Sequence, residues 1–214
     1  MTKVKICCIQ SIEEAQMAID NGVYAIGLVS QMPSGPGIIS EEKIRKITKW
    51  APDDIKTVML TSLQNANDLV TQIDYCKPDI VQLVDSQNAE TYETLHMILS
   101  DLEIIQVIHV VDKNSIFEAI DVAQFVDFIL LDSGNPNLQI KVLGGTGKTH
   151  NWEYSKKINK NVDIPVFLAG GLKPENVAEA VKTVKPFGVD VCSRLRNDGN
   201  LDESKLKMFM ENMR

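Results

Sequence analysis

The chain has 214 residues and a mass of 23.8 kDa, with 44% hydrophobic and 24% charged residues, as in ordinary globular proteins that bury a full core. Its 22 basic and 29 acidic residues leave a net charge of −7 and a pI near 5.0, which excludes a general attraction for nucleic acid or an anionic membrane. No apolar run is long enough to cross a bilayer, and the first residues lack the apolar segment of a signal peptide.

Short apolar, β-branched runs predict eight strands, at residues 4–9, 24–29, 55–60, 80–84, 104–111, 126–131, 165–168 and 188–191. Most lack strict polar alternation, which is typical of parallel strands covered on both faces. Helical spacing follows each strand, at residues 12–19, 41–50, 65–75, 89–99, 115–123, 151–158, 174–184 and 204–213. Ser11 and Glu14 predict a capping box, Ser40 a second cap, and Pro174 a first helical turn.

Eight strands alternating with helices favour a (β/α)8 barrel of the α/β class, the TIM barrel, over a doubly wound sheet, which usually has five or six strands. No linker rich in Pro, Gly or Ser and no block of charge divides the chain. The prediction is a single (β/α)8 barrel domain over residues 1–214.

The four cysteines, Cys7, Cys8, Cys76 and Cys192, form no Cys-x-x-Cys pair, and no histidine lies at zinc-ligand spacing from them. We therefore expect free thiols in a reducing, cytoplasmic compartment. Cys76 is expected to be a small buried residue.

In a barrel, catalytic residues lie where strands end and the following loops begin. Cys7 ends the first predicted strand and Asp132 follows the sixth, so a substrate could lie between them. Cys7 and Cys8 are adjacent, and only one of them can face the lumen if the strand alternates. A thiol is a base only as the thiolate, and a carboxylic acid donates only if burial raises its pKa. The alternative is a buried cysteine beside an aspartate that caps a turn.

A second candidate site follows the seventh and eighth strands. Gly170 and Gly171 precede a helix, where the backbone can approach a ligand closely and the helix N-terminus favours an anion. Ser193 adds a hydroxyl after the eighth strand, and these two loops often build the phosphate site of a barrel. The alternative is a tight turn that needs glycine for its conformation alone.

The segment GGTGKT (144–149) ends like a nucleotide-binding P-loop. A P-loop needs glycine at position 142, which is Val142, and a strand directly before it, and neither condition holds. A glycine-rich active-site loop that includes Gly145 fits better.

Together these residues resemble the phosphoribosylanthranilate isomerase family, (β/α)8 enzymes of tryptophan biosynthesis. The resemblance covers nearly the whole chain and rests on motifs in family order and spacing: KIC (5–7), LLDS (130–133), GGTGKT (144–149), LAGGL (168–172) and PFGVDV (186–191). It implies that Cys7 faces the lumen as general base and that Asp132 is the general acid of an Amadori rearrangement.

The resemblance also implies that Gly145, Gly170, Gly171 and Ser193 surround the phosphate of a small phosphorylated sugar-amine substrate. It implies no cofactor and no metal. We expect no nucleic-acid or membrane partner, and a monomer or a homodimer.

Several positions depart from the family pattern. The usual Cys-Gly after the first strand is Cys7-Cys8, and the usual arginine after the second strand, which pairs with the anthranilate carboxylate, is Pro36. The usual Gln-Leu-His-Gly, Phe-Asp-Trp and Ser-Ser-Gly stretches are replaced at residues 82–85, 150–152 and 192–196. Proline offers neither charge nor donor to a carboxylate.

Three further candidate site residues follow from these departures. Arg194 could contact the phosphate directly or could obstruct it. His109 and His150 fall at strand-end loops and are candidates for contact with the aglycone, the alternative being surface or capping roles.

The first hypothesis is therefore an aldose–ketose isomerase acting on an N-linked phosphoribosyl amine, with anthranilate as the default aglycone. The alternatives are a related barrel enzyme acting on a different phosphosugar and a non-catalytic phosphosugar-binding barrel. A pure binder has no need for both Cys7 and Asp132, so their presence counts against it.

Overall fold

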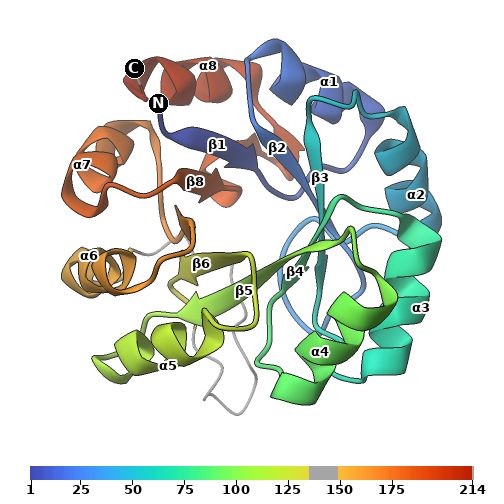
Figure 1. Ribbon diagram of the computed structural model, residues 1–214. Coiled ribbons are helices and arrows are strands. Elements are labelled where there is room, and N and C mark those ends of the chain that lie inside the picture. Colours follow the sequence, from blue (N-terminus) through green and yellow to red (C-terminus); the bar gives the residue numbers. More distant parts are fainter. Residues whose placement is uncertain (135–148, 214) are drawn as a thin grey trace.

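The computed structural model describes residues 1–134 and 149–213, which form a closed ring of eight parallel strands surrounded by helices (Figure 1). The barrel strands are β1 (Lys3–Ile6), β2 (Ala25–Val29), β3 (Lys56–Thr61), β4 (Ile80–Leu83), β5 (Glu103–His109), β6 (Phe128–Asp132), β7 (Val166–Leu168) and β8 (Gly188–Val191). The helices are α1 (Ile12–Asp20), α2 (Glu41–Trp50), α3 (Ala66–Cys76), α4 (Ala89–Ile98), α5 (Asn114–Val122), α6 (Trp152–Asn161), α7 (Pro174–Val184) and α8 (Glu203–Asn212).

The predicted (β/α)8 barrel is confirmed, and every predicted strand and helix has its counterpart. One region was not predicted. Between β8 and α8 the chain forms a short 3-10 turn, η1 (Ser193–Leu195), and a two-stranded hairpin of β9 (Arg196–Asn197) and β10 (Asn200–Leu201). Both elements are too short to give a periodic signal in the sequence.

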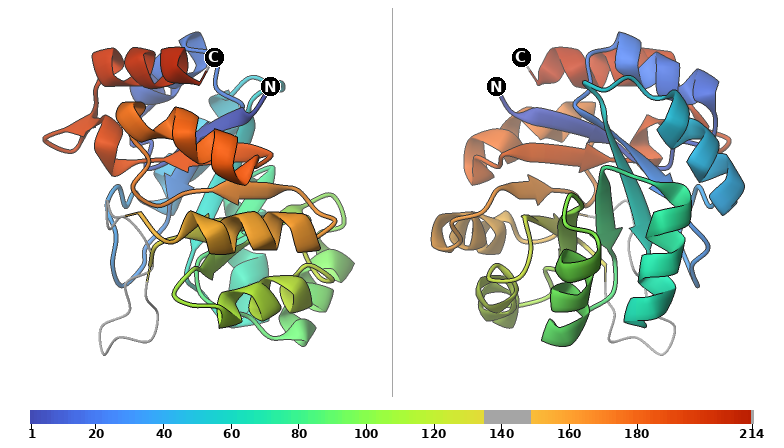
Figure 2. Two further views of the ribbon diagram at one scale, coloured as in Figure 1. Left: turned by 90° about the vertical axis from the view of Figure 1, so that its left-hand side faces the viewer. Right: turned by 45° about the vertical axis from the view of Figure 1, so that its right-hand side comes forward.

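The barrel closes between its first and last strands. β1 pairs with β2 on one side and with β8 on the other, so residues at opposite ends of the chain become neighbours. The N–H of Cys7 continues this closure by donating to the carbonyl of Val191 at 2.9 Å. The helices cover the outside, and α8 packs beside α7 to complete the ring (Figure 2).

The predicted capping box of α1 forms only in part. The Ser11 hydroxyl accepts from the N–H of Glu14 at 3.3 Å, as a cap should. The Glu14 carboxylate, however, accepts from the N–H of Gln10 at 2.9 Å rather than from Ser11. Glu14 is thereby turned toward the β1–α1 loop, beside the closure of the barrel.

The core has two layers, because successive strand residues point to opposite faces. Outward residues such as Ile6, Ile26 and Leu28 pack under the helices, whereas inward residues such as Val58 and Ile105 fill the barrel. Within the described ranges, no helix combines the length and apolar character needed to cross a membrane.

An aromatic cluster closes the amino-terminal end of the barrel. Tyr24, Phe128, Phe167 and Phe187 lie at or just before the starts of their strands, with ring centroids 5.4–6.4 Å apart. Apolar rings pack this end and leave polar groups to the other, so the chemistry is positioned at the carboxyl ends of the strands.

Candidate active site

A cavity that opens to solvent lies at the carboxyl ends of the strands, the end at which (β/α)8 barrels place their active sites. Its walls come from every strand end and from the β2–α2 loop. The described lining residues are Cys7, Cys8, Val29, Met32, Ser34, Gly35, Pro36, Leu60, Gln82, Val84, Val107, Leu130, Asp132, Ala169, Gly170, Gly171, Leu172, Asp190, Val191, Cys192, Ser193 and Arg194.

Cys7 lies one residue after β1 and is buried in the interior of the barrel. A Cβ built on Gly27 would lie 3.0 Å from the Cys7 Sγ, so the thiol packs against a strand that offers no side chain there. Burial raises the pKa of the Cys7 thiol to about 11, with the Lys5 ammonium opposing the shift and Asp190 adding to it. In the ligand-free protein Cys7 is therefore a thiol at neutral pH.

A buried ion pair lies directly beneath Cys7. The Nζ of Lys5 lies 2.8 Å from the Oδ1 of Asp190, and both side chains are almost completely buried. Burial lowers the pKa of Lys5, but Asp190 and Cys7 together outweigh it and the net shift is upward, so the lysine stays charged beside the thiol. This pair was not predicted from the sequence. The feature that could have indicated it is a single charged residue at an inward position of each of two apolar strands, Lys5 on β1 and Asp190 on β8.

Asp132 ends β6 and lines the same cavity as Cys7. Burial raises the pKa of the Asp132 carboxyl above its ordinary value. The N–H of Ser133, which donates to Oδ1 at 2.7 Å, and the nearby His109 act in the opposite direction without cancelling the effect. A carboxyl in this environment holds its proton to a higher pH than an exposed aspartate does.

The loops after β7 and β8 form the third part of the cavity. Gly170, Gly171, Ser193 and Arg194 all line it, so the structure brings together these four residues of the predicted anion site. Gly170 has φ +79°, and a Cβ there would lie 3.0 Å from Ser133 and from His150. Glycine is therefore required both for the backbone conformation and for the close packing of β7 on the β6 end.

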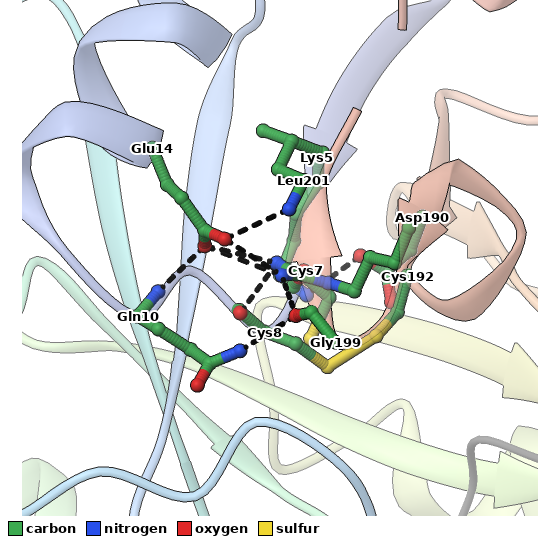
Figure 3. Close-up of a disulfide and its surroundings, with 10 residues drawn as sticks. Lys5, Cys7, Cys8, Gln10, Glu14, Asp190, Cys192, Gly199 and Leu201 are labelled. Atoms are coloured by element: carbon green, nitrogen blue, oxygen red, sulfur yellow. Dashed lines mark hydrogen bonds and ion pairs between the residues drawn. A yellow bond between two sulfur atoms is a disulfide. The ribbon is translucent and has the colours of Figure 1, made fainter. Parts of the chain in front are cut away.

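The expectation of free thiols is wrong for two of the four cysteines. Cys8 and Cys192 are joined by a disulfide, whereas Cys7 and Cys76 are free and buried (Figure 3). The two residues are 184 positions apart, and only the closure of β1 on β8 brings them together. No spacing rule applied to the sequence can show a contact that depends on barrel closure.

The alternation argument also fails for Cys8. Cys7 lines the cavity, as expected for the lumen-facing residue, but Cys8 lines it too. The strand has ended at Ile6, and Cys8 has φ +65°, a left-handed conformation in which strand alternation no longer holds. This is the backbone region that favours glycine, which accounts for the glycine usual at this position in the family.

A second buried ion pair holds the loop after β8. Arg196 lies 3.0 Å from Glu14, and its guanidinium also donates to the carbonyl oxygens of Cys7 and Cys8. The N–H of Leu201 donates to the same carboxylate at 2.8 Å. This Glu14–Arg196 clamp joins the β1–α1 loop to the β9–β10 hairpin and was not predicted, because its two residues are 182 positions apart.

The two candidate histidines lie behind the cavity wall rather than in it. His109 is buried with its Nε2 3.1 Å from the Val84 carbonyl oxygen, and His150 has its Nε2 2.6 Å from the Ser155 hydroxyl. Burial lowers the pKa of His150 to about 4, so it is neutral at pH 7. A neutral His150 cannot form an ion pair with a substrate carboxylate. Gly145 lies outside the described residues.

The β2–α2 loop forms the wall opposite the glycines, through Met32, Ser34, Gly35 and Pro36. None of these side chains is basic. Gly37 follows with φ +77°, and a Cβ there would lie 2.5 Å from the Cβ of Cys8, so this loop packs tightly on the Cys8 turn. Within residues 1–134 and 149–213, no group of three or more His, Cys, Asp or Glu side chains could hold a metal ion.

This fold and this cavity are those of a (β/α)8-barrel enzyme in which a thiol, a carboxyl group and a glycine-containing rim line one cavity. The sequence model of the family described as "N-(5'phosphoribosyl)anthranilate (PRA) isomerase" matches residues 4–212. The chain therefore belongs to the phosphoribosylanthranilate isomerase family.

Individual relatives agree. The N-(5'-phosphoribosyl)anthranilate isomerase of Haloferax volcanii is 34% identical, with 98% of this chain and 92% of the relative aligned. A solved structure of phosphoribosyl anthranilate isomerase from Thermotoga maritima has a TM-score of 0.82 and 30% identity, covering 99% of this chain and 98% of that one. Another such isomerase, solved with reduced 1-(o-carboxyphenylamino)-1-deoxyribulose 5-phosphate, has a TM-score of 0.79 and 27% identity, covering 99% and 98%.

Proposed function

We propose that this chain isomerises N-(5-phosphoribosyl)anthranilate, an aldose–ketose rearrangement of the Amadori type, in tryptophan biosynthesis. The observation that carries the proposal is that Cys7 and Asp132 line one cavity whose rim is formed by Gly170, Gly171 and Ser193. Family membership supplies the substrate class, and a thiol, a carboxyl and a glycine-containing rim on one cavity support an assignment of base, acid and anion site.

Asp132 acts as the general acid in this proposal. It gives its proton to the ring oxygen of the aminoaldose, and the ring opens to a Schiff base. An aspartic acid with an ordinary pKa has lost this proton at neutral pH, so the raised pKa of Asp132 supports the assignment. General acid catalysis of this kind contributes roughly 10²–10⁴ in rate.

Cys7 acts as the general base. It removes the proton on C2 of the Schiff base, and the enolamine that forms becomes the ketone product. The thiol must be ionised for this step, although its pKa of about 11 keeps most molecules protonated. The state with Cys7 ionised and Asp132 protonated carries the same number of protons as the state with Cys7 protonated and Asp132 ionised, so a proton exchange within the site interconverts the two without a change in pH.

The phosphate binds at the rim in this proposal. The backbone of Gly170 and Gly171 can approach an anion closely, and the N-terminus of α7 points a positive dipole end toward the same loop. Ser193 and Arg194 line the cavity from the neighbouring strand end. Holding the phosphate orients a small substrate between the acid and the base.

Complementation of a host that lacks phosphoribosylanthranilate isomerase tests the proposal, together with a fluorescence assay of the purified full chain on the same substrate. Growth and turnover that both require Cys7 and Asp132 are expected. Turnover of a different phosphosugar amine, with none on phosphoribosylanthranilate, would indicate the related-enzyme alternative. Phosphosugar binding without turnover of any such substrate would indicate a binding barrel.

Two further expectations belong to this proposal. The protein is a cytoplasmic enzyme, and it is a monomer or a homodimer; a Thermotoga maritima relative is described as a dimeric isomerase from which monomers were generated. Sedimentation of the purified chain distinguishes the two assembly states.

A further inference from the structure

The Cys8–Cys192 disulfide lies at the seam where the barrel closes. Cys8 follows β1, Cys192 follows β8, and their Cα atoms are 6.0 Å apart, within the range that a disulfide requires (Figure 3). Cys8 has a left-handed backbone, a conformation in which a residue with a β-carbon is less favourable than glycine. The backbone conformation therefore does not explain why residue 8 is a cysteine, and the reason has to lie in the chemistry of its sulfur.

The fold holds the two cysteines together by contacts that do not involve sulfur. The N–H of Cys7 donates to the Val191 carbonyl at 2.9 Å, which fixes the two strand ends. Arg196, four residues after Cys192, donates to the carbonyl of Cys8 and is itself held by Glu14. With both backbones fixed, the two thiols have a high effective concentration, and the bond can form and open within the folded protein.

The pair also borders the proposed phosphate site. Cys8 and Cys192 both line the cavity, and Ser193 directly follows Cys192. A small thiol that enters the cavity can therefore reach the bond. Cys7, the neighbouring residue, does not compete, because its thiol is buried and protonated at neutral pH.

We propose that Cys8 and Cys192 are a redox-active pair, a site of reversible thiol–disulfide exchange that sets the affinity of the rim for the substrate phosphate. The co-reactant is a dithiol in one direction and its disulfide in the other. In reduction, a thiolate of the dithiol attacks one sulfur and the Cys8–Cys192 bond breaks. The second thiol of the reductant then releases the mixed disulfide, so two electrons and two protons pass to the pair.

The direction of the effect follows from size. Bonded sulfurs are about 2.05 Å apart, whereas two separate thiols need a van der Waals separation of roughly 3.5–4 Å. Cys8 is buried and its carbonyl is held by Arg196, while Cys192 is partly exposed. The movement therefore falls on Cys192 and on the turn to Ser193. Reduction loosens that turn, which must be ordered again when phosphate binds.

The identity of the anion rests on the proposed function, so the first experiment does not use turnover. Thiols are counted in the unfolded full chain after equilibration with oxidised or reduced dithiothreitol. We expect two free thiols after oxidation and all four after reduction, with Cys7 and Cys76 free in the oxidised form. A Cys7→Ser variant should still lose two thiols on oxidation. Four thiols in the oxidised sample, or a bond that disappears in Cys7→Ser, would overturn the proposal.

The second experiment is calorimetry with inorganic phosphate in both redox states. We expect the dissociation constant to rise about two- to tenfold on reduction, the fold-change that ordering one or two side chains costs. Cys8→Gly, which suits the left-handed backbone, and Cys192→Ser should each have the weaker affinity and no response to the reductant. The matched control Cys76→Ser, on α3, should keep the full response.

Equal phosphate affinity in both states of the wild-type chain, or a redox response that survives in Cys8→Gly, would overturn the proposal. These outcomes are separate from those of the isomerase assay. A chain that turns over substrate but shows no redox effect refutes the switch alone, and a chain without turnover that shows the effect refutes the isomerase assignment alone.

Discussion

The two halves of the cavity differ in chemistry. All charged residues of its described lining, Asp132, Asp190 and Arg194, come from β6, β8 and the loop after β8, and Cys7 lies one residue after β1, the strand that pairs with β8. Strands β2 to β5 and the β2–α2 loop contribute uncharged groups only: Val29, Met32, Ser34, Gly35, Pro36, Leu60, Gln82, Val84 and Val107. In the proposed function the first half carries the proton chemistry and the phosphate rim, while the second presents an uncharged, mostly apolar wall to the rest of the ligand.

The departures from the family pattern fall on both halves. Pro36 and Val84, which replace the usual arginine and histidine, lie on the uncharged half, whereas Cys8 and the stretch after β8 that includes Arg194 lie on the charged half. Apolar contact can hold an aromatic ring by burial alone, without fixing a carboxylate. We infer that the chain keeps the reaction and recognises the aglycone chiefly through its ring, and the predictions below test each half.

The largest effect is expected from Asp132→Asn. The variant cannot donate a proton to the ring oxygen, so kcat should fall by roughly 10²–10⁴. Binding of a product-like phosphate ligand should stay within a few fold of wild type, because the amide preserves the shape of the side chain. Steady-state kinetics and calorimetry measure the two quantities. Equal losses in both would mean that Asp132 has a structural role.

Cys7→Ala should lower kcat by a similar factor, roughly 10²–10⁴, because the base is removed and the cavity is otherwise kept. Cys8→Gly is the matched control at the adjacent position, and its loss should be confined to phosphate affinity. Progress curves at saturating substrate separate the two variants. Full activity of Cys7→Ala would show that the base lies elsewhere.

The ion pair beneath the thiol should matter for folding. Lys5→Met leaves the Asp190 carboxylate buried without a countercharge, which should lower the free energy of unfolding by about 3–5 kcal/mol. Lys56→Met is the control, since its pair with Glu103 has side chains 38% and 36% exposed and is worth about 1 kcal/mol or less. Urea denaturation gives the free energy of unfolding of both variants. Equal losses would show that the buried Lys5–Asp190 pair matters no more for folding than the exposed Lys56–Glu103 pair.

The pH dependence of kcat/KM tests whether the two catalytic groups work as a pair. The raised pKa of Asp132 and the pKa of about 11 for Cys7 bracket a range in which the active protonation state is a constant fraction of the enzyme. We expect a plateau between them, a fall above pH 11 as the second proton is lost, and a fall at acid pH when both groups are protonated. In Asp132→Asn, residual activity should instead rise about tenfold per pH unit toward pH 11. A wild-type profile with that same rise would show that Asp132 does not take part in proton transfer.

The sequence predicted the fold well because its signals are local. Apolar runs and caps locate the elements, and three of them, α2 at 41–50, α7 at 174–184 and β8 at 188–191, have the predicted bounds. Three contacts could not be predicted from the sequence, because each joins the first βα unit to residues at the other end of the chain. They are the Cys8–Cys192 disulfide, the Lys5–Asp190 ion pair and the Glu14–Arg196 clamp. Contacts across the closure depend on which strands pair, and no spacing within the sequence contains that information.

The smallest effect is expected on the apolar wall, from Pro36→Arg. The new guanidinium would lie where the family usually has its arginine and could pair with the anthranilate carboxylate. A charge-assisted hydrogen bond is worth about 1.5–3 kcal/mol when buried, but Pro36 is exposed, so solvent reduces the gain to about three- to tenfold in KM. The chemical step is unchanged, and kcat should stay near the wild-type value.

Pro33→Arg is the matched control, because Pro33 lies on the same loop, is also exposed and does not line the cavity. It adds the same charge without reaching the ligand, so its KM should not change. Steady-state kinetics at low and high salt give the comparison, since an exposed ion pair weakens as ionic strength rises. If Pro36→Arg leaves KM unchanged while Pro33→Arg does the same, the carboxylate is held from another wall. The division of the cavity into a charged half for chemistry and an uncharged half for the aglycone would then be wrong.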